Sequence, residues 1–339
     1  MSNNSTSSYC DAILASSAGP PPVYNHTTRM AIAAVLGILL AVTFLGNVVL
    51  ILAIVQNRRL HTRTNVFVAS LATADIGVSL LVMPFGIYQQ ASNKEWRLGE
   101  LVCLLSTSAD VMLCTVSILH LLCLCLDRYL AICHPYLLQH VGKRLTCQII
   151  VACWVLPIFI SFLPIMNKWN TIGIEHFIAC LVPPEGVCVF LVNPEFAVIC
   201  SIVAFYIPVT TMTVCYWRIY RIAQSQMEQI SKMTLGKLRK KTKAATTLVI
   251  VMACFSICWS PFFLLNVIDP FIGYRIPYVA WLVAQWLGYI NSAMNPFLFS
   301  FFNSTFRVSI CRVLGCNKYR SKIETETSVT MSLQDSTFR

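Results

Sequence analysis

The chain has 339 residues, of which 57% are hydrophobic and only 12% are charged, whereas a soluble domain carries about 45–50% and about 25% respectively. This composition excludes an ordinary soluble globular protein. The 25 Lys and Arg outnumber the 14 Asp and Glu, giving a net charge of +11, an excess that fits either a nucleic-acid-binding protein or a basic membrane protein.

Long stretches without charge decide between these two classes. Five uncharged stretches cover residues 30–57, 145–167, 196–217, 244–268 and 276–306, and two more, 64–93 and 101–126, hold one acid each, Asp75 and Asp110. About 20 apolar residues cross the roughly 30 Å hydrocarbon layer, so each stretch is long enough for one transmembrane helix. The sequence therefore predicts an all-α membrane protein with a seven-helix bundle over residues 30–302.

The basic residues set the orientation of the bundle. Five of them lie on one side, and the other 20 lie on the opposite side. Because cytoplasmic loops are enriched in Lys and Arg, we expect an extracellular N-terminus and a cytoplasmic C-terminus at the plasma membrane. The basic excess then faces lipid and cytoplasmic partners, and no nucleic-acid partner is expected.

Residues 1–29 form the predicted extracellular tail. They lack the basic start and apolar middle of a cleaved signal peptide, so we expect the first span to direct insertion. Asn3, Asn4 and Asn25 each begin an Asn-X-Ser/Thr pattern. These patterns predict glycosylation, because this tail is expected on the exterior side of the membrane.

An acid inside a membrane is a candidate functional residue, because burying it unpaired costs several kcal/mol. Asp110 lies seven residues after Cys103, about 10 Å below the outer end of its helix. Aromatic residues occur at comparable depth on the last two spans: Trp259, Phe262, Phe263, Trp286 and Tyr289. A carboxylate among aromatic rings suits a ligand ammonium ion. The alternative is a protonated Asp110 that is hydrogen-bonded within the bundle.

Asp75 lies deeper in the membrane than Asp110. The polar residues expected at its level on other spans are Ser117, Asn291, Ser292 and Asn295. Oxygen ligands of this kind suit a small hard cation such as Na⁺, and a water-filled hydrogen-bond network explains the same residues equally well. Both interpretations remain open.

Three short motifs mark the third, sixth and seventh spans. Asp127-Arg128-Tyr129 ends the third span, Pro261 follows Cys258-Trp259-Ser260 in the sixth, and Pro296 follows Asn295 in the seventh. A proline inside a helix removes a backbone hydrogen bond and kinks the helix. Two broken helices near a ligand pocket predict a two-state element, although such kinks also occur without switching.

These motifs, together with Asn47, Trp154 and Pro208 in the same order, resemble a rhodopsin-like (class A) G-protein-coupled receptor over about residues 30–316. The resemblance implies a receptor that signals through a heterotrimeric G protein and is not an enzyme. His120 is the only histidine within a span and lacks catalytic companions. A transporter would show repeated halves, and an opsin would carry a lysine in the seventh span. This sequence shows neither feature, which disfavours both classes.

The surroundings of Asp110 look like those of biogenic-amine receptors, with Trp259-Ser260-Pro261-Phe262-Phe263 and Trp286-Leu287-Gly288-Tyr289. That resemblance implies that Asp110 binds the ligand ammonium, that Tyr289 hydrogen-bonds to it, and that the aromatic rings pack on the ligand. Further candidate ligand contacts are Val111, Cys114 and Ser201.

Within that branch, the chain is most similar to trace amine-associated receptors. They carry an extra tail-to-loop disulfide, which here would join Cys10 to Cys180 beside the usual Cys103–Cys188 pair. Phe299 departs from the family, which has Tyr there, so Tyr216 loses a hydroxyl partner. Lys241 stands where an acid often pairs with Arg128, and we therefore expect ligand-independent signalling.

A primary monoamine is the expected ligand, and stimulatory coupling with a cAMP rise is the implied signal. The alternatives are a serotonin-like classical aminergic receptor and a receptor for di- or polyamines. In a di- or polyamine receptor, Glu195 would bind a second ammonium group of the ligand. The alternative is that Glu195 is a solvated charge of the loop. No cofactor is expected, apart from structural Na⁺ at Asp75.

The segment after the seventh span has apolar residues at helical spacing. We expect an amphipathic eighth helix over residues 303–316 lying on membrane lipid. Cys311 or Cys316 near its end is a candidate for palmitoylation. Residues 317–339 are predicted to be a disordered, phosphorylatable tail, with receptor kinases and arrestin as possible partners.

Overall fold

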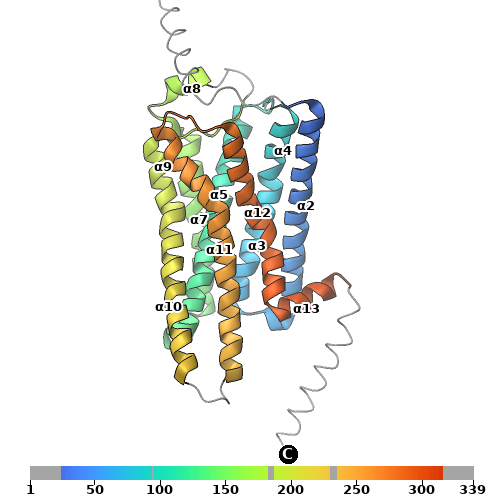
Figure 1. Ribbon diagram of the computed structural model, residues 1–339, viewed down its shortest axis with the longest axis vertical. Helices are drawn as coiled ribbons and strands as arrows, with labels where there is room; N and C mark the ends of the chain where they lie inside the picture. Colours follow the sequence, from blue (N-terminus) through green and yellow to red (C-terminus); the bar gives the residue numbers. More distant parts are fainter. Residues whose placement is uncertain (1–23, 94, 182–186, 230–234, 316–339) are drawn as a thin grey trace, which may run out of the picture.

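The computed structural model describes residues 24–93, 95–181, 187–229 and 235–315, and every regular element among them is helical (Figure 1). The predicted all-α fold is confirmed for this part of the chain. The elements in order are α2 (His26–Gln56), η1 (Arg58–Leu60), α3 (Arg63–Leu81), α4 (Met83–Ala91), α5 (Glu100–Cys133), α6 (Pro135–Gln139), α7 (Lys143–Met166), η2 (Trp169–Thr171), α8 (Glu175–Leu181), α9 (Pro194–Ser201), η3 (Ile202–Tyr206), α10 (Ile207–Gln229), α11 (Leu235–Phe271), α12 (Tyr278–Phe302) and α13 (Ser304–Val313).

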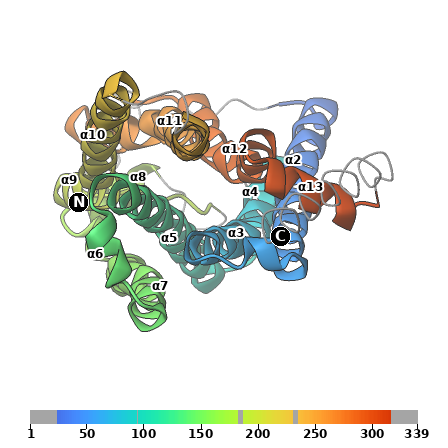
Figure 2. The same ribbon diagram turned by 90° about the horizontal axis from the view of Figure 1, so that it is seen from below.

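The long helices stand side by side and form one bundle, which Figure 1 shows from the side and Figure 2 from below. Within the described residues, six helical segments are long and apolar enough to cross a membrane. They are α2, α3 with α4, α5, α7, α9 with η3 and α10, and the outer part of α11. The seventh predicted span is α12, whose run is interrupted by polar residues such as Gln285 and Asn291.

The ends and breaks of the helices have local causes. Asn25 caps α2, because its side chain accepts the backbone N–H of Thr28 at 2.8 Å. The helix therefore begins at His26, inside the predicted tail of residues 1–29. Between α9 and α10, η3 is a single π-type turn that ends just before Pro208, a residue without a backbone N–H.

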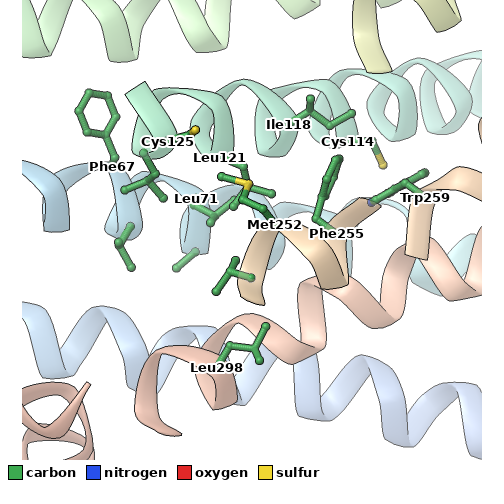
Figure 3. Packing of buried hydrophobic residues seen from close by; sticks show 14 of the residues in the cluster. Phe67, Leu71, Cys114, Ile118, Leu121, Cys125, Met252, Phe255, Trp259 and Leu298 are labelled. Atoms are coloured by element: carbon green, nitrogen blue, oxygen red, sulfur yellow. The ribbon is translucent and has the colours of Figure 1, made fainter. Parts of the chain in front are cut away.

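The core is an apolar cluster that joins α3, α5 and α11. Leu71, Ile118, Leu121 and Phe255 are at most 1% exposed and belong to one contiguous cluster (Figure 3). Helix α5 occupies a central position, because it packs against α3, α7 and α10. A residue on α5 therefore reaches several helices at once, and both Asp110 and Asp127 lie on this helix.

After α12 the chain turns, and α13 leaves the bundle sideways at its lower end (Figure 1). Asn303 caps this helix by accepting the N–H of Thr305 at 3.0 Å. Phe306 is buried against Phe299, with ring centroids 5.7 Å apart. Asn57 donates to Ser309 at 2.5 Å and so ties α13 to the inner end of α2.

Candidate functional site

Asp110 is a partly exposed carboxylate on α5 that is held by neutral donors. Tyr289 and Gln285 of α12 donate to Oδ2 at 2.7 Å and 3.2 Å, and the Cys114 thiol donates to Oδ1 at 3.3 Å. Gln285 also donates to the Tyr289 hydroxyl at 2.9 Å. Among the described residues no Lys, Arg or His forms an ion pair with Asp110. The carboxylate is thus oriented but not neutralised.

Gln285 is a site residue that the sequence analysis missed. It lies four residues before Tyr289, so the two side chains share one face of α12. That i, i+4 spacing was the only indication in the sequence that Gln285 belongs to the site, since a single glutamine in an apolar run is part of no motif.

Aromatic rings from the last two spans form a cluster in the same part of the bundle. The centroid of Trp259 lies 5.7 Å from that of Phe262 and 5.9 Å from that of Phe263, and Trp286 meets Tyr289 edge-on at 5.2 Å. The approach of α12 depends on Gly288, because a Cβ there would lie 2.8 Å from the Trp259 ring. The predicted aromatic set is therefore brought together.

The other predicted ligand contacts differ in their surroundings. Val111 is partly exposed, next to Asp110 on α5. Ser201 is fully buried, and its hydroxyl accepts a hydrogen bond from Asn266 of α11 at 3.0 Å. Glu195 is exposed in the first turn of α9, with no hydrogen bond or ion pair to a described residue. The structure does not place Glu195 in contact with Asp110.

The loop between α11 and α12 is anchored to its surroundings. Tyr274 donates to the Val192 carbonyl at 2.8 Å, and burial together with the charges of Asp269 and Glu195 raises the pKa of Tyr274 to about 12. Asp269 is 3% exposed and accepts the Ile276 N–H at 3.0 Å and the Trp281 indole N–H at 3.1 Å. Asp269 is thus a buried residue of α11.

Two predicted disulfides concern the exterior side. Cys103 and Cys188 are joined, with their Cα atoms 5.7 Å apart, so the segment before α9 is fixed to the start of α5. Gln89 of α4 donates to the Cys188 carbonyl at 2.8 Å. Cys180 is also in a disulfide. Its predicted partner Cys10 lies outside the described residues, as do Asn3, Asn4, Cys316 and the tail after it.

Around Asp75, buried oxygen atoms gather from three helices. Asn295 of α12 donates to Asp75 Oδ2 at 2.7 Å, and Asn47 of α2 donates to the Ser292 carbonyl at 3.1 Å. Several buried side-chain oxygens have no hydrogen-bond partner in the described structure: Asp75 Oδ1, Ser117 Oγ, Asn291 Oδ1 and Asn295 Oδ1. This donor set fits a hard cation or ordered water.

The Asp127-Arg128-Tyr129 motif lies at the inner end of α5. Arg128 donates to Asp127 at 2.8 Å and also to Thr64, and the Tyr129 hydroxyl lies 3.3 Å from His134 Nε2. Asp127 has a further partner that was not predicted from the sequence, Arg63 of α3, at 2.6 Å. The side chains of residues 237–243, including Lys241, lie outside the described part of the structure.

The predicted switch residues on the later helices are buried or interior. Pro261 lies inside α11 and Pro296 inside α12. The Tyr216 hydroxyl is buried and has no hydrogen-bond partner in the described structure. The Phe299 ring packs on Phe306.

The sequence profile described as "7 transmembrane receptor (rhodopsin family)" matches residues 46–299. The chain is 40% identical over 321 residues to the 5-hydroxytryptamine receptor 4 of Cavia porcellus, covering 88% of this chain and 82% of that protein.

Two further relatives have comparable coverage. Identity is 36% over 321 residues with the histamine H2 receptor of Canis lupus familiaris, covering 93% of this chain and 85% of that protein. It is 34% over 300 residues with the trace amine-associated receptor 4 of Mus musculus, covering 85% and 86%. The chain therefore belongs to the rhodopsin family of seven-transmembrane receptors, in the biogenic-amine branch of the class A G-protein-coupled receptors, and is not an enzyme.

Proposed function

We propose that this chain is a receptor for a small amine, which binds through its ammonium group to Asp110, and that it signals through a stimulatory heterotrimeric G protein. The observation that supports this proposal is a carboxylate that accepts hydrogen bonds from three neutral donors and has no ion pair with any described residue. An ammonium ligand supplies the missing countercharge, and the nearby rings of Trp259, Trp286 and Tyr289 favour a cation.

A primary monoamine is the favoured ligand class. The pocket side of α9 offers one serine, Ser201, and its hydroxyl is already engaged by Asn266, which disfavours a catechol ring needing several hydroxyl partners. 5-Hydroxytryptamine, histamine and trace amines are the first monoamines to test, because relatives of this chain are named for them. The trace-amine assignment rests on the cysteine pattern, and Cys180 is disulfide-bonded as it requires.

A di- or polyamine is the second candidate. Glu195 is the observation that favours it, because its carboxylate is exposed and unpaired in the described structure. An elongated ligand with one ammonium at Asp110 would need its second ammonium to reach Glu195.

The test is a cAMP assay in transfected cells with a panel of monoamines, diamines and polyamines. Asp110→Asn should lower the potency of every active amine by about 100-fold or more, because a buried ligand cation loses its countercharge. Glu195→Gln should leave monoamine potency unchanged and lower only diamine potency. Full potency of the active amine on Asp110→Asn would refute the assignment of Asp110 as its partner.

We propose that Na⁺ binds beside Asp75, among the oxygens of Ser117, Asn291 and Asn295. Four buried oxygens without a described partner support this site. NaCl should raise the melting temperature of the purified receptor more than KCl does at equal ionic strength, because an ion that binds only the folded state stabilises it. Asp75→Asn should remove that difference. Equal melting in both salts would leave the water network as the explanation.

The remaining proposals concern the membrane and the cytoplasmic partners. An extracellular tail glycosylated at Asn3, Asn4 or Asn25 follows from the expected orientation. Cys311 is a palmitoylation candidate because it lies on α13, which extends away from the bundle. Receptor kinases and arrestin would act on the tail after residue 316. Mass spectrometry of the receptor from membranes tests both modifications directly.

A further inference from the structure

Asp127 is buried, and Arg63 engages its carboxylate more fully than the neighbouring Arg128 does. Arg63 donates to Oδ1 twice, through Nη2 at 2.6 Å and through Nε at 3.0 Å. Arg128 reaches Oδ2 through Nη2 alone, at 2.8 Å, and Thr64 donates to the same oxygen at 2.7 Å. Two guanidinium groups therefore share one carboxylate.

Arg63 is fixed independently of Arg128. Its Nη1 donates to the backbone carbonyl of Leu138 in α6 at 3.4 Å and to that of Val141, between α6 and α7, at 3.1 Å. Arg128 is held less completely, since its Nε is buried without a hydrogen-bond partner in the described structure. If Arg128 moves, Arg63 has its own contacts to stay in place.

Arg63 makes it easier for Arg128 to leave Asp127, for two reasons. Breaking a buried ion pair is costly chiefly because one charge is left uncompensated. With Arg63 in place, Asp127 keeps a cation and the Thr64 hydroxyl. In addition, two guanidinium groups on one carboxylate repel each other, which weakens the hold of Asp127 on Arg128.

We propose that Arg63 is a positioning residue for signalling, which keeps Asp127 neutralised when Arg128 leaves it to engage the G protein. Arg63 thereby raises ligand-independent activity. This inference rests on the proposed G-protein coupling and assigns a role to a residue outside the Asp127-Arg128-Tyr129 motif.

The test uses the full-length receptor in lipid nanodiscs, without ligand, and measures nucleotide exchange on purified stimulatory, inhibitory and phospholipase-activating G proteins. Arg63→Gln keeps hydrogen-bond donors but removes the charge, and it should slow basal exchange about fivefold, the size expected for a partly buried charge-assisted contact. Arg63→Lys keeps the charge and should retain most of the activity. The matched control is Arg59→Gln, because Arg59 is an exposed cation of η1 with no ion pair to a described residue.

The Asp127→Asn background separates this role from a purely structural one. Arg63→Gln should have no further effect on exchange there, because the carboxylate through which Arg63 acts is gone. Two outcomes would overturn this inference and leave the proposed function standing. One is basal exchange at or above the wild-type rate in Arg63→Gln, and the other is the same fivefold loss in the Asp127→Asn background. A wild-type receptor that accelerates exchange on none of the three G proteins, either without ligand or with any amine of the panel, would instead overturn the proposed function, and this inference with it.

Discussion

At the scale of single residues, the pocket depends on how the Asp110 carboxylate is held. Tyr289 and Gln285 both donate to the same oxygen, Oδ2, and Gln285 bonds Tyr289 as well. Three side chains thus form a closed ring of hydrogen bonds. Such a ring fixes the direction of the carboxylate before a ligand arrives, which reduces the ordering cost of binding.

Gln285→Ala should therefore weaken amine binding by about tenfold, since a hydrogen bond to a charged group contributes about 1.5–3 kcal/mol. Competition binding with the amine identified by the panel measures this change. Gln224→Ala is the matched control, because Gln224 forms a similar bond to Tyr220 at 2.6 Å on exposed α10. Equal affinity for the two variants would show that Gln285 does not orient Asp110.

At the scale of elements, the contact between α11 and α12 depends on one glycine. A Cβ at Gly288 would lie 2.8–2.9 Å from three carbons of the Trp259 ring. A buried indole ring has little room to move, so either the ring or α12 must shift. The position of Trp259 beneath the pocket is thus set by the absence of a side chain on the neighbouring helix.

Gly288→Ala should lower the melting temperature of the ligand-free receptor by about 5 °C, because overpacking costs about 1–3 kcal/mol. Differential scanning fluorimetry in detergent measures this shift. Gly37→Ala is the control, since a Cβ at Gly37 on α2 meets nothing within 4 Å, and alanine favours a helix over glycine. Equal melting temperatures for the Gly288→Ala and Gly37→Ala receptors would contradict a tight contact between Gly288 and the Trp259 ring.

At the scale of the whole molecule, the net charge of +11 separates by side of the membrane. The basic face is expected inside, and the exterior is close to neutral. Asp269 adds no charge to the exterior surface, since it is a buried residue of α11 that accepts hydrogen bonds from the Ile276 N–H and the Trp281 indole N–H.

The orientation predicts where epitope tags are accessible on intact cells. An antibody should stain an N-terminal tag without permeabilisation and a C-terminal tag only after it, because the basic loops stay inside. The two tags on one receptor serve as controls for each other. Staining of the C-terminal tag on intact cells would reverse the assigned topology.

The spans and the family follow from the amino-acid sequence without a structure. Span length is set by bilayer thickness, so an uncharged run of residues reports it without any knowledge of packing. Asp75, Asp110 and Asp127 are conspicuous for the same reason, since each interrupts or ends an apolar run.

Only the tertiary structure decided which side chains meet those acids. Val35 on the outer face of α2 is 65% exposed and Leu50 on the same helix is 1% exposed, yet both are apolar, because lipid and protein core favour the same residues. Hydrophobic periodicity therefore does not reveal how a membrane helix is rotated. That rotation brings Gln285 to Asp110 across 175 residues and Arg63 to Asp127 across 64 residues.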